Sequence, residues 1–267
     1  YVNSEIWNME KKNKRVAIIT GSAKGIGKAI AEKFIEQNIQ VILADINEEK
    51  LHETSLEIDP SKKNTDSIKL DVSSEEEINK LKQFVLKKYG KLDILVNNAG
   101  IAPNRLIEDQ SLGEWERVLK VNLTGTFLCS RMAIELMKKQ KDKLKYILNI
   151  SSISGAVGSV GRSAYGVSKA GIIQLTKQMA TEFAEFKILV NSISPGPVNT
   201  DLTSNSEKAF ESYISRIPLG KFAEKNSIAT AAVFLTSKEC DFITGHTLNI
   251  DGGFLAGGIN FPKTDLK

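Results

Sequence analysis

Short apolar runs rich in β-branched residues alternate with longer amphipathic stretches along most of the chain, and this alternation is what most limits its fold. Several of the runs are apolar at consecutive positions, the pattern of strands whose two faces are both covered by helices. The sequence therefore predicts an α/β fold with a parallel, doubly wound sheet. Seven candidate strands lie at Val16–Thr20, Val41–Ala44, Ser67–Leu70, Leu92–Val96, Tyr146–Ile150, Ile188–Ile193 and Leu248–Ile250.

The chain of 267 residues is predicted to form a single domain. No repeat or low-complexity linker interrupts the alternation, and the one prominently polar loop, residues 59–66, lies between a predicted helix and a predicted strand. We expect the domain to span residues 13–253, between an N-terminal leader at residues 1–12 and a C-terminal tail at residues 254–267. Residues 1–8 are interpreted as leader or vector-derived sequence, because Met9 lies just before the first strand.

Composition argues against several classes of protein. The chain has 36 basic and 32 acidic residues, a net charge of +4, and its basic residues are scattered, which argues against nucleic acid as a partner. Cys129 and Cys240 stand alone, which argues against a disulfide framework and a structural zinc site and fits a reducing cytoplasm. The polar N-terminus and the lack of any run of about 20 apolar residues argue against secretion and against a membrane partner.

A glycine-rich loop follows the first predicted strand. Residues 20–27 read Thr-Gly-Ser-Ala-Lys-Gly-Ile-Gly and open the first helix, where glycines let the backbone approach a pyrophosphate at a helix N-terminus. The alternative for such a motif alone is a glycine-rich turn without a ligand. Asp45 lies 24 residues after Gly21 and ends the second strand, where a carboxylate can accept hydrogen bonds from ribose hydroxyls. It could instead cap the following helix at Glu48 and Glu49.

Two further strand ends carry polar or small residues. Asp71-Val72 follows the third predicted strand, and Asn97-Asn98-Ala99-Gly100 follows the fourth. Open α/β sheets bind their ligands at the carboxyl ends of the strands. We therefore expect these segments to meet the glycine loop at one crevice.

Four motifs together resemble the short-chain dehydrogenase/reductase family: Thr-Gly-x-x-x-Gly-x-Gly at 20–27, Asn-Asn-Ala-Gly at 97–100, Tyr165-x-x-x-Lys169 and Pro195-Gly196. The resemblance covers about residues 13–253. It implies a seven-stranded Rossmann fold, a nicotinamide dinucleotide, a homotetramer and a catalytic tetrad of Asn122, Ser152, Tyr165 and Lys169. The residues expected to bind the cofactor are Gly21, Ser22, Lys24, Gly25, Ile26, Gly27, Asp45, Asp71, Val72, Asn98, Ala99, Gly100, Tyr165, Lys169, Pro195, Gly196, Val198 and Thr200.

Tyr165 and Lys169 lie four residues apart, which on a helix places both side chains on one face. Ionising a phenol near neutral pH needs a pKa shift of roughly 3 units, or about 4 kcal/mol. A lysine ammonium about 4 Å away supplies a similar amount at an effective dielectric constant of about 20. The pair is therefore adequate for proton transfer, although such a pair without other motifs is more often part of a solvated helix face.

Ser152 ends the fifth predicted strand, 13 residues before Tyr165, the spacing at which members of the family carry the serine that hydrogen-bonds the substrate oxygen. Its neighbour Ser151 is the alternative, because successive strand side chains face opposite ways, and the spacing favours Ser152. The resemblance implies that Asn122 holds a water linked to the lysine. Taken alone, Asn122 is better interpreted as a mid-helix polar residue without a catalytic role.

The implied reaction is hydride transfer between a secondary alcohol carbon and the nicotinamide ring, with Tyr165 exchanging the hydroxyl proton and Ser152 polarising the oxygen. The resemblance also assigns Lys169 to the nicotinamide ribose, Thr200 to the carboxamide and residues 201–218 to a mobile substrate lid. Since His52 and His246 are the only histidines, a zinc alcohol dehydrogenase lacks its ligands, and no metal is expected.

Two residues disagree about the cofactor. Asp45 would repel the 2′-phosphate of NADP, whereas Lys24 would attract it. Asp45 lies at a fixed strand end, while a lysine can turn into solvent. We therefore expect NAD, with NADP as the alternative.

Three functions are compatible with these residues. The first is an NAD(H)-dependent oxidoreductase that interconverts a small secondary alcohol and a ketone. The second is an NADPH-dependent 3-oxoacyl-acyl-carrier-protein reductase that acts on an acyl thioester; against it, Phe186 occupies the position where some of these reductases carry an arginine for the carrier protein, although Lys187 lies beside it. The third is a non-catalytic dinucleotide-binding regulatory protein, which the intact tetrad argues against.

The helices predicted from Trp115 to about Gln140 and from Ala164 to Phe186 carry apolar residues on more than one face. This surplus predicts subunit packing, with a thick core in a lone subunit as the alternative. The apolar residues in question are Phe127, Leu128, Met132, Ile172, Ile173, Leu175, Met179 and Phe183.

Overall fold

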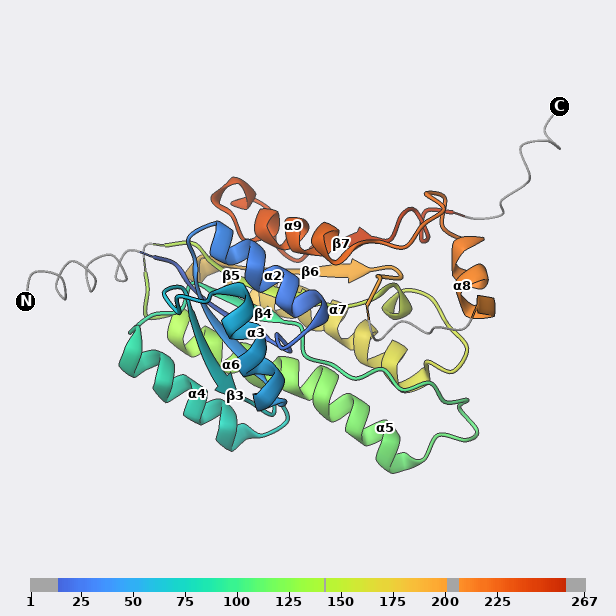
Figure 1. Cartoon of the computed structure of the whole chain (residues 1–267), viewed down its shortest axis with the longest axis horizontal. Coiled ribbons are helices and arrows are strands. Elements are labelled where there is room, and N and C mark those ends of the chain that lie inside the picture. Colours follow the sequence, from blue (N-terminus) through green and yellow to red (C-terminus); the bar gives the residue numbers. More distant parts are fainter. Residues whose placement is uncertain (1–13, 142, 201–206, 258–267) are drawn as a thin grey trace, which may run out of the picture.

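Seven parallel strands form one sheet in the order β3-β2-β1-β4-β5-β6-β7 (Figure 1). The structure is a computed structural model that describes residues 14–141, 143–200 and 207–257. The single-domain Rossmann-like fold with helices on both faces of the sheet is therefore confirmed. The strands are β1 (Val16–Thr20), β2 (Gln40–Asp45), β3 (Thr65–Lys69), β4 (Ile94–Asn97), β5 (Lys145–Ile150), β6 (Ile188–Pro195) and β7 (Thr247–Ile250).

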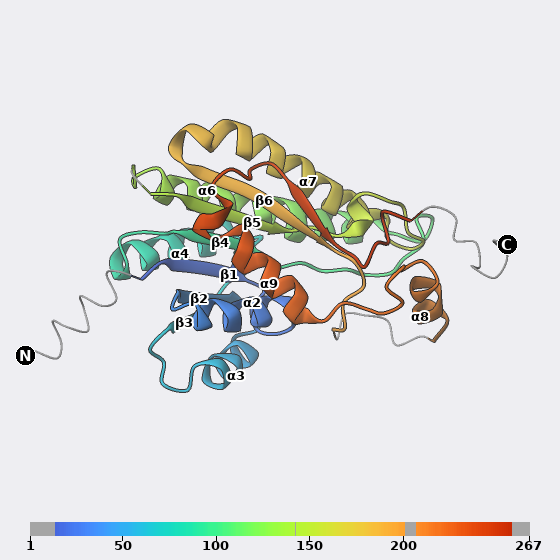
Figure 2. The same ribbon diagram turned by 90° about the horizontal axis from the view of Figure 1, so that it is seen from above.

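Helices cover both faces of this sheet. Figure 2 shows α2, α3 and α9 on one side and α4, α6 and α7 on the other, with the strands between them. Among the described residues, no helix is long and apolar enough to cross a membrane. The helices are α2 (Gly25–Glu36), α3 (Glu48–Ile58), α4 (Glu75–Lys88), α5 (Leu112–Leu119), α6 (Gly125–Met137), α7 (Ser163–Phe183), α8 (Glu207–Ile214) and α9 (Lys225–Leu235).

The consecutive apolar residues of the central strands divide between two hydrophobic cores. In β1, Ile18 packs into the core beneath α4 and α6, whereas its neighbour Ile19 packs into the core beneath α2 and α9. Strand side chains alternate between faces, so a strand covered on both sides is apolar at most consecutive positions. Strand β3 lies at the edge of the sheet, and after the buried Thr65 its residues are half-buried or exposed.

The single helix expected from Trp115 to about Gln140 is wrong in detail. Helix α5 passes through a π-helical turn, Lys120–Thr124, before α6 begins at Gly125. Such turns are frequent at functional sites, and this one contains Asn122.

Most of the apolar residues of α6 and α7 are buried in the chain's own core. Leu128, Met132, Ile172 and Met179 are all less than a tenth exposed, whereas Phe127 is 44% exposed. A thick core in one subunit thus accounts for much of the apolar surplus, and the homotetramer stays a prediction.

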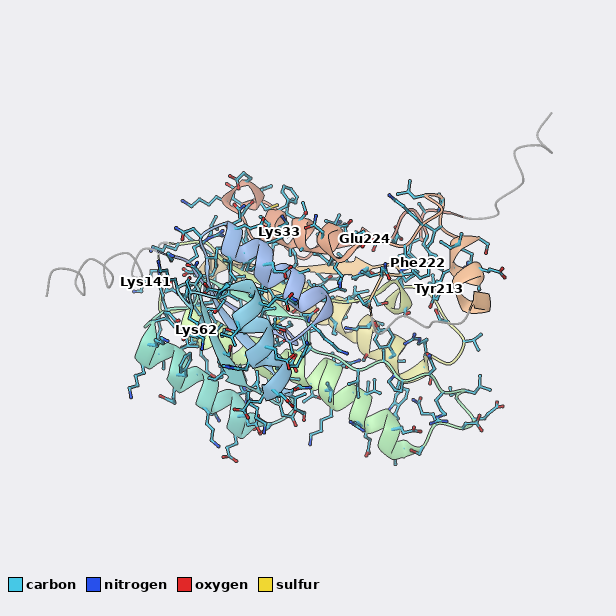
Figure 3. All side chains as sticks on the ribbon, in the orientation of Figure 1. Lys33, Lys62, Lys141, Tyr213, Phe222 and Glu224 are labelled. Atoms are coloured by element: carbon cyan, nitrogen blue, oxygen red, sulfur yellow. The ribbon has the colours of Figure 1, made fainter. Side chains whose placement is uncertain are left out.

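The carboxyl ends of β6 and β7 point toward the end of the molecule where α8 lies (Figure 1). Figure 3 shows Tyr213 of α8 and Phe222 close together at this end, with Lys62 and Lys141 at the opposite end. The two aromatic rings meet edge to face with centroids 6.1 Å apart. Of the predicted lid, residues 207–218 belong to this region and residues 201–206 lie outside the described residues, as do the leader at 1–12 and most of the tail at 254–267.

Candidate active site

The glycine loop packs directly against the end of β4. The side-chain amide nitrogen of Asn98 donates to the carbonyls of Thr20 (3.0 Å) and Gly21 (2.9 Å), and the Thr20 hydroxyl accepts from the backbone nitrogens of Asn98 (3.0 Å) and Ala99 (3.1 Å). Gly21 has a φ of +65°, and a Cβ there would lie 2.7 Å from the Ala99 Cα. A Cβ on Gly27 would lie 2.3 Å from the Gly21 carbonyl oxygen. Only glycine fits at either position.

Helix α2 begins directly behind this loop. Lys24 occupies its N-cap position in an extended conformation, and no described side chain caps the helix. The first backbone N–H groups of a helix that lacks such a cap can bind an anion. The loop and helix together fit the pyrophosphate of a dinucleotide.

Asp45 is fixed between β2 and the glycine loop. One carboxylate oxygen accepts from the Ala23 backbone nitrogen and the other from that of Asn47, each at 3.0 Å. The cap of α3 is Asn47, whose side chain accepts from the Lys50 nitrogen at 3.0 Å. The alternative in which Asp45 caps that helix is therefore wrong.

One cavity of about 820 Å³ brings most of the predicted site residues together. It runs from Asp45 and Asp71 at the ends of β2 and β3 to Ser152, Tyr165 and Lys169, and includes the segment from Pro195 to Thr200. Three predicted residues do not line it. Ser22 is buried and accepts from the Ala44 nitrogen at 3.0 Å, Gly27 is buried within α2, and Asn122 is fully buried in the π-helical turn.

The two serines at the end of β5 have different partners. The Ser151 hydroxyl donates to the carbonyl of Lys169 at 2.9 Å, so it ties β5 to α7. The Ser152 hydroxyl accepts from the Ser154 nitrogen at 3.1 Å and acts on the Tyr165 phenol, whose pKa it lowers. Both serines line the cavity, and the choice of Ser152 over Ser151 stays a prediction.

Burial governs the electrostatics of Tyr165. It raises the pKa of the phenol, while the hydrogen bond with Ser152 and the positive charge of Arg162 lower it. The expected helper Lys169 is buried, and its ammonium donates to the Ile150 carbonyl at 2.7 Å and lies 5.6 Å from the centre of the Tyr165 ring. Burial also lowers the pKa of Lys169 to about 8. Arg162, which sequence reasoning did not include, is thus a second positively charged side chain beside the phenol.

Several residues that line the cavity are absent from the sequence prediction. Arg162 and Tyr213 lie near Tyr165, and Arg117 and Lys120 come from α5 and the π-helical turn. Arg162 stands three residues before Tyr165, a helical spacing that could have singled it out. The other three carry no sequence signal that separates them from surface residues. Among the described side chains, no group of three histidines, cysteines or acids could hold a metal ion.

Comparison with known proteins gives consistent results. A family model described as Enoyl-(Acyl carrier protein) reductase matches residues 21–255. The 3-oxoacyl-acyl-carrier-protein reductase FabG of Thermotoga maritima is 38% identical over 242 residues, which are 90% of this chain and 98% of that protein.

Solved structures show the same likeness. The crystal structure of gox2181 has a TM-score of 0.88 at 30% identity and covers 93% of this chain and 99% of its own. The crystal structure of an actinorhodin polyketide ketoreductase with NADPH has a TM-score of 0.86 at 29% identity and covers 91% of this chain and 98% of its own.

Proposed function

The chain belongs to the short-chain dehydrogenase/reductase family and is an oxidoreductase acting on CH–OH groups; from this premise we propose that it interconverts a secondary alcohol and a ketone with NAD(H), using Tyr165 as general acid and base. The observation that carries the proposal is that Ser152 and Tyr165 lie together in the wall of a cavity that also contains the glycine loop. Asn122, Ser152, Tyr165 and Lys169 form the proposed catalytic set.

Each residue at this end of the cavity has a defined task in the proposed reaction. Tyr165 gives its phenolic proton to the carbonyl oxygen in reduction and takes it back in oxidation. Ser152 hydrogen-bonds the same oxygen and polarises it. Lys169 contributes a nearby ammonium that favours the ionised phenol, and the bound nicotinamide supplies or accepts the hydride.

The proposed cofactor is NAD(H). Asp45 is fixed by two backbone nitrogens at the end of β2, so its negative charge cannot move away from a 2′-phosphate without breaking those bonds. Lys24 is exposed, lines the same cavity and is the residue that would favour NADPH.

A second candidate is NADPH-dependent reduction of a 3-oxoacyl thioester on an acyl carrier protein. The specific observation that favours it is the 38% identity to the FabG reductase of Thermotoga maritima over nearly its whole length. Phe186 and the exposed Lys187 lie at the turn after α7. In this candidate, Lys187 would be the basic residue that contacts the carrier protein. For either candidate we propose a cytoplasmic homotetramer.

Parallel titrations with NADH and NADPH at fixed ionic strength, followed by nicotinamide fluorescence, test the cofactor. Tighter binding of NADH supports the first candidate, and tighter binding of NADPH supports the second. Turnover is then measured with ketones and with a 3-oxoacyl thioester. Absence of turnover with every ketone and thioester would contradict both.

A further inference from the structure

An arginine side chain lines the cavity next to Tyr165, the proposed general acid. Arg162 immediately precedes α7 and lines the cavity, and its guanidinium carbon lies 5.3 Å from the centre of the Tyr165 ring. One of its terminal nitrogens donates to the Ala102 carbonyl at 3.0 Å. Whatever group reacts at Tyr165 therefore has this cation as a neighbour.

Most of the hydrogen-bonding capacity of Arg162 is unused. A guanidinium carries five N–H donors, and the bond to Ala102 is its one hydrogen bond within the part of the chain that the structure describes. No carboxylate among the described residues lies within 4.0 Å of it, although the nearby Arg105 pairs with Glu114 at 3.3 Å. A half-buried cation without an ionic partner costs free energy unless a ligand supplies the opposite charge.

Hydrogen bonds made by the two neighbours of Arg162 in the sequence hold its backbone in place. The Arg105 nitrogen donates to the Gly161 carbonyl at 2.9 Å, and residues 105 and 162 form an isolated β-bridge. On the other side, the Ser163 hydroxyl donates to the Gln110 side chain at 2.5 Å. A fixed guanidinium fork matches the geometry of a carboxylate, which it can bind through two parallel hydrogen bonds.

The acidic residues of the cavity belong to other elements. Asp45 ends β2, Asp71 follows β3, and Glu116 lies on α5; none of them is within ion-pair distance of Arg162. The residues around the reacting position, Ser152, Ser154 and Tyr213, are uncharged. This end of the cavity therefore presents two cations, Arg162 and Lys169, of which Lys169 is buried and donates to the Ile150 carbonyl, beside several hydroxyl groups.

We propose that Arg162 binds a carboxylate that the substrate carries within a few bonds of the reacting carbon, so that the substrates are oxo acids and the corresponding hydroxy acids. The inference rests on the proposed function, because it uses Tyr165 and Ser152 to place the reacting oxygen. It names the substrate class that the reaction itself leaves open.

The test compares the turnover of three oxo acids, pyruvate, acetoacetate and levulinate, with that of their uncharged amides. The cofactor is NADH, or NADPH if the protein binds NADPH more tightly. We expect kcat/KM for at least one acid to exceed that for its amide by on the order of 10- to 100-fold. Arg162→Gln removes this preference, mainly by raising KM for the acid. Arg162→Lys keeps the charge and loses the fork, so it retains part of the preference. The matched control Arg105→Gln, an exposed arginine outside the cavity, keeps the preference of the parent protein.

Two results overturn the inference while leaving the proposed function intact. One is turnover of ketones with no preference for any of the acids. The other is an equal loss for acid and amide in Arg162→Gln, which would mean that Arg162 acts through Tyr165. Calorimetric binding of the same acids to the protein with bound nucleotide decides the matter even without turnover, since Arg162→Gln should weaken binding by about 10-fold or more. Equal binding by the two proteins contradicts the inference.

Discussion

The side chain of Asn122 holds both backbone polar groups of Ile101. Its carbonyl oxygen accepts from the Ile101 nitrogen at 2.8 Å, and its amide nitrogen donates to the Ile101 oxygen at 3.0 Å and to the Ser168 hydroxyl at 3.0 Å. One fully buried residue thus joins the π-helical turn, the segment after β4 and α7. Asn122 thereby fixes α7, the helix that carries Tyr165 and Lys169.

Asn122→Ala should lower the free energy of unfolding by about 2–4 kcal/mol, because it removes three hydrogen bonds and leaves buried partners unsatisfied. Urea denaturation monitored by circular dichroism measures the change. Asn249→Ala, at an exposed strand position, serves as the control and should change the free energy by less than about 0.5 kcal/mol. Equal effects of the two substitutions would show that the Asn122 bonds contribute nothing.

Gly27→Ala should abolish tight nucleotide binding. The added methyl group would meet the Gly21 carbonyl at 2.3 Å, and this is backbone that cannot move aside without deforming the glycine loop. In Gly113→Ala, the control, the methyl group meets no other atom within 4 Å, and alanine is favoured in a helix. NADH fluorescence titration should show at least a tenfold weaker complex for the first variant alone. Unchanged affinity in Gly27→Ala would mean that the loop does not hold the nucleotide.

Lys169 should make the stability of the protein depend on alkaline pH. Burial lowers its pKa to about 8 from the ordinary value of 10.5, so between these values the unfolded chain binds more protons than the folded chain. The contribution of Lys169 to stability is therefore least favourable below about pH 8 and rises with pH. Relative to Lys169→Met, the parent protein should gain about 2 kcal/mol of unfolding free energy from about pH 7 to about pH 10. A constant difference over this range would contradict a depressed pKa.

Asp45→Asn should shift cofactor preference toward NADPH. The substitution keeps the shape of the side chain and removes the charge that faces a 2′-phosphate, so the ratio of NADPH to NADH affinity should rise at least about tenfold. Lys24→Gln is the opposite probe and should lower the same ratio. If both variants keep the ratio of the parent protein, neither residue selects the cofactor.

Much of the fold could be predicted because the relevant signals are local. The central strands are mostly apolar, and Gly21 and Gly27 occupy positions where a side chain would clash. The π-helical turn at Lys120–Thr124 could not be predicted, because none of its residue types is specific to π-helical hydrogen bonding. Similarly, Asp45 and Asn47 are both residue types that cap helices well. Asn47 is the cap of α3 because β2 extends as far as Asp45, which the sequence does not reveal.

The candidate site divides in the same way. Residues in fixed motifs, such as Tyr165 and Lys169, could be named because their spacing occurs together with the other motifs of the family. Spacing could also have indicated that Arg162 lies near Tyr165, but its lack of an ionic partner could not be predicted. That lack depends on the tertiary fold, because the loop that places Arg105 and Ala102 beside Arg162 carries no acidic partner for its guanidinium within the described residues.

Turnover by Tyr165→Phe is the most direct test of the central claim that Tyr165 exchanges the substrate proton. The substitution removes the phenolic oxygen and keeps the ring, so kcat should fall by roughly 10²- to 10⁴-fold while the dissociation constant of NADH changes far less. Tyr213→Phe, a second tyrosine in the cavity wall, provides the comparison and should lose much less activity. A Tyr165→Phe protein that reduces its best ketone as fast as the parent protein would contradict the mechanism.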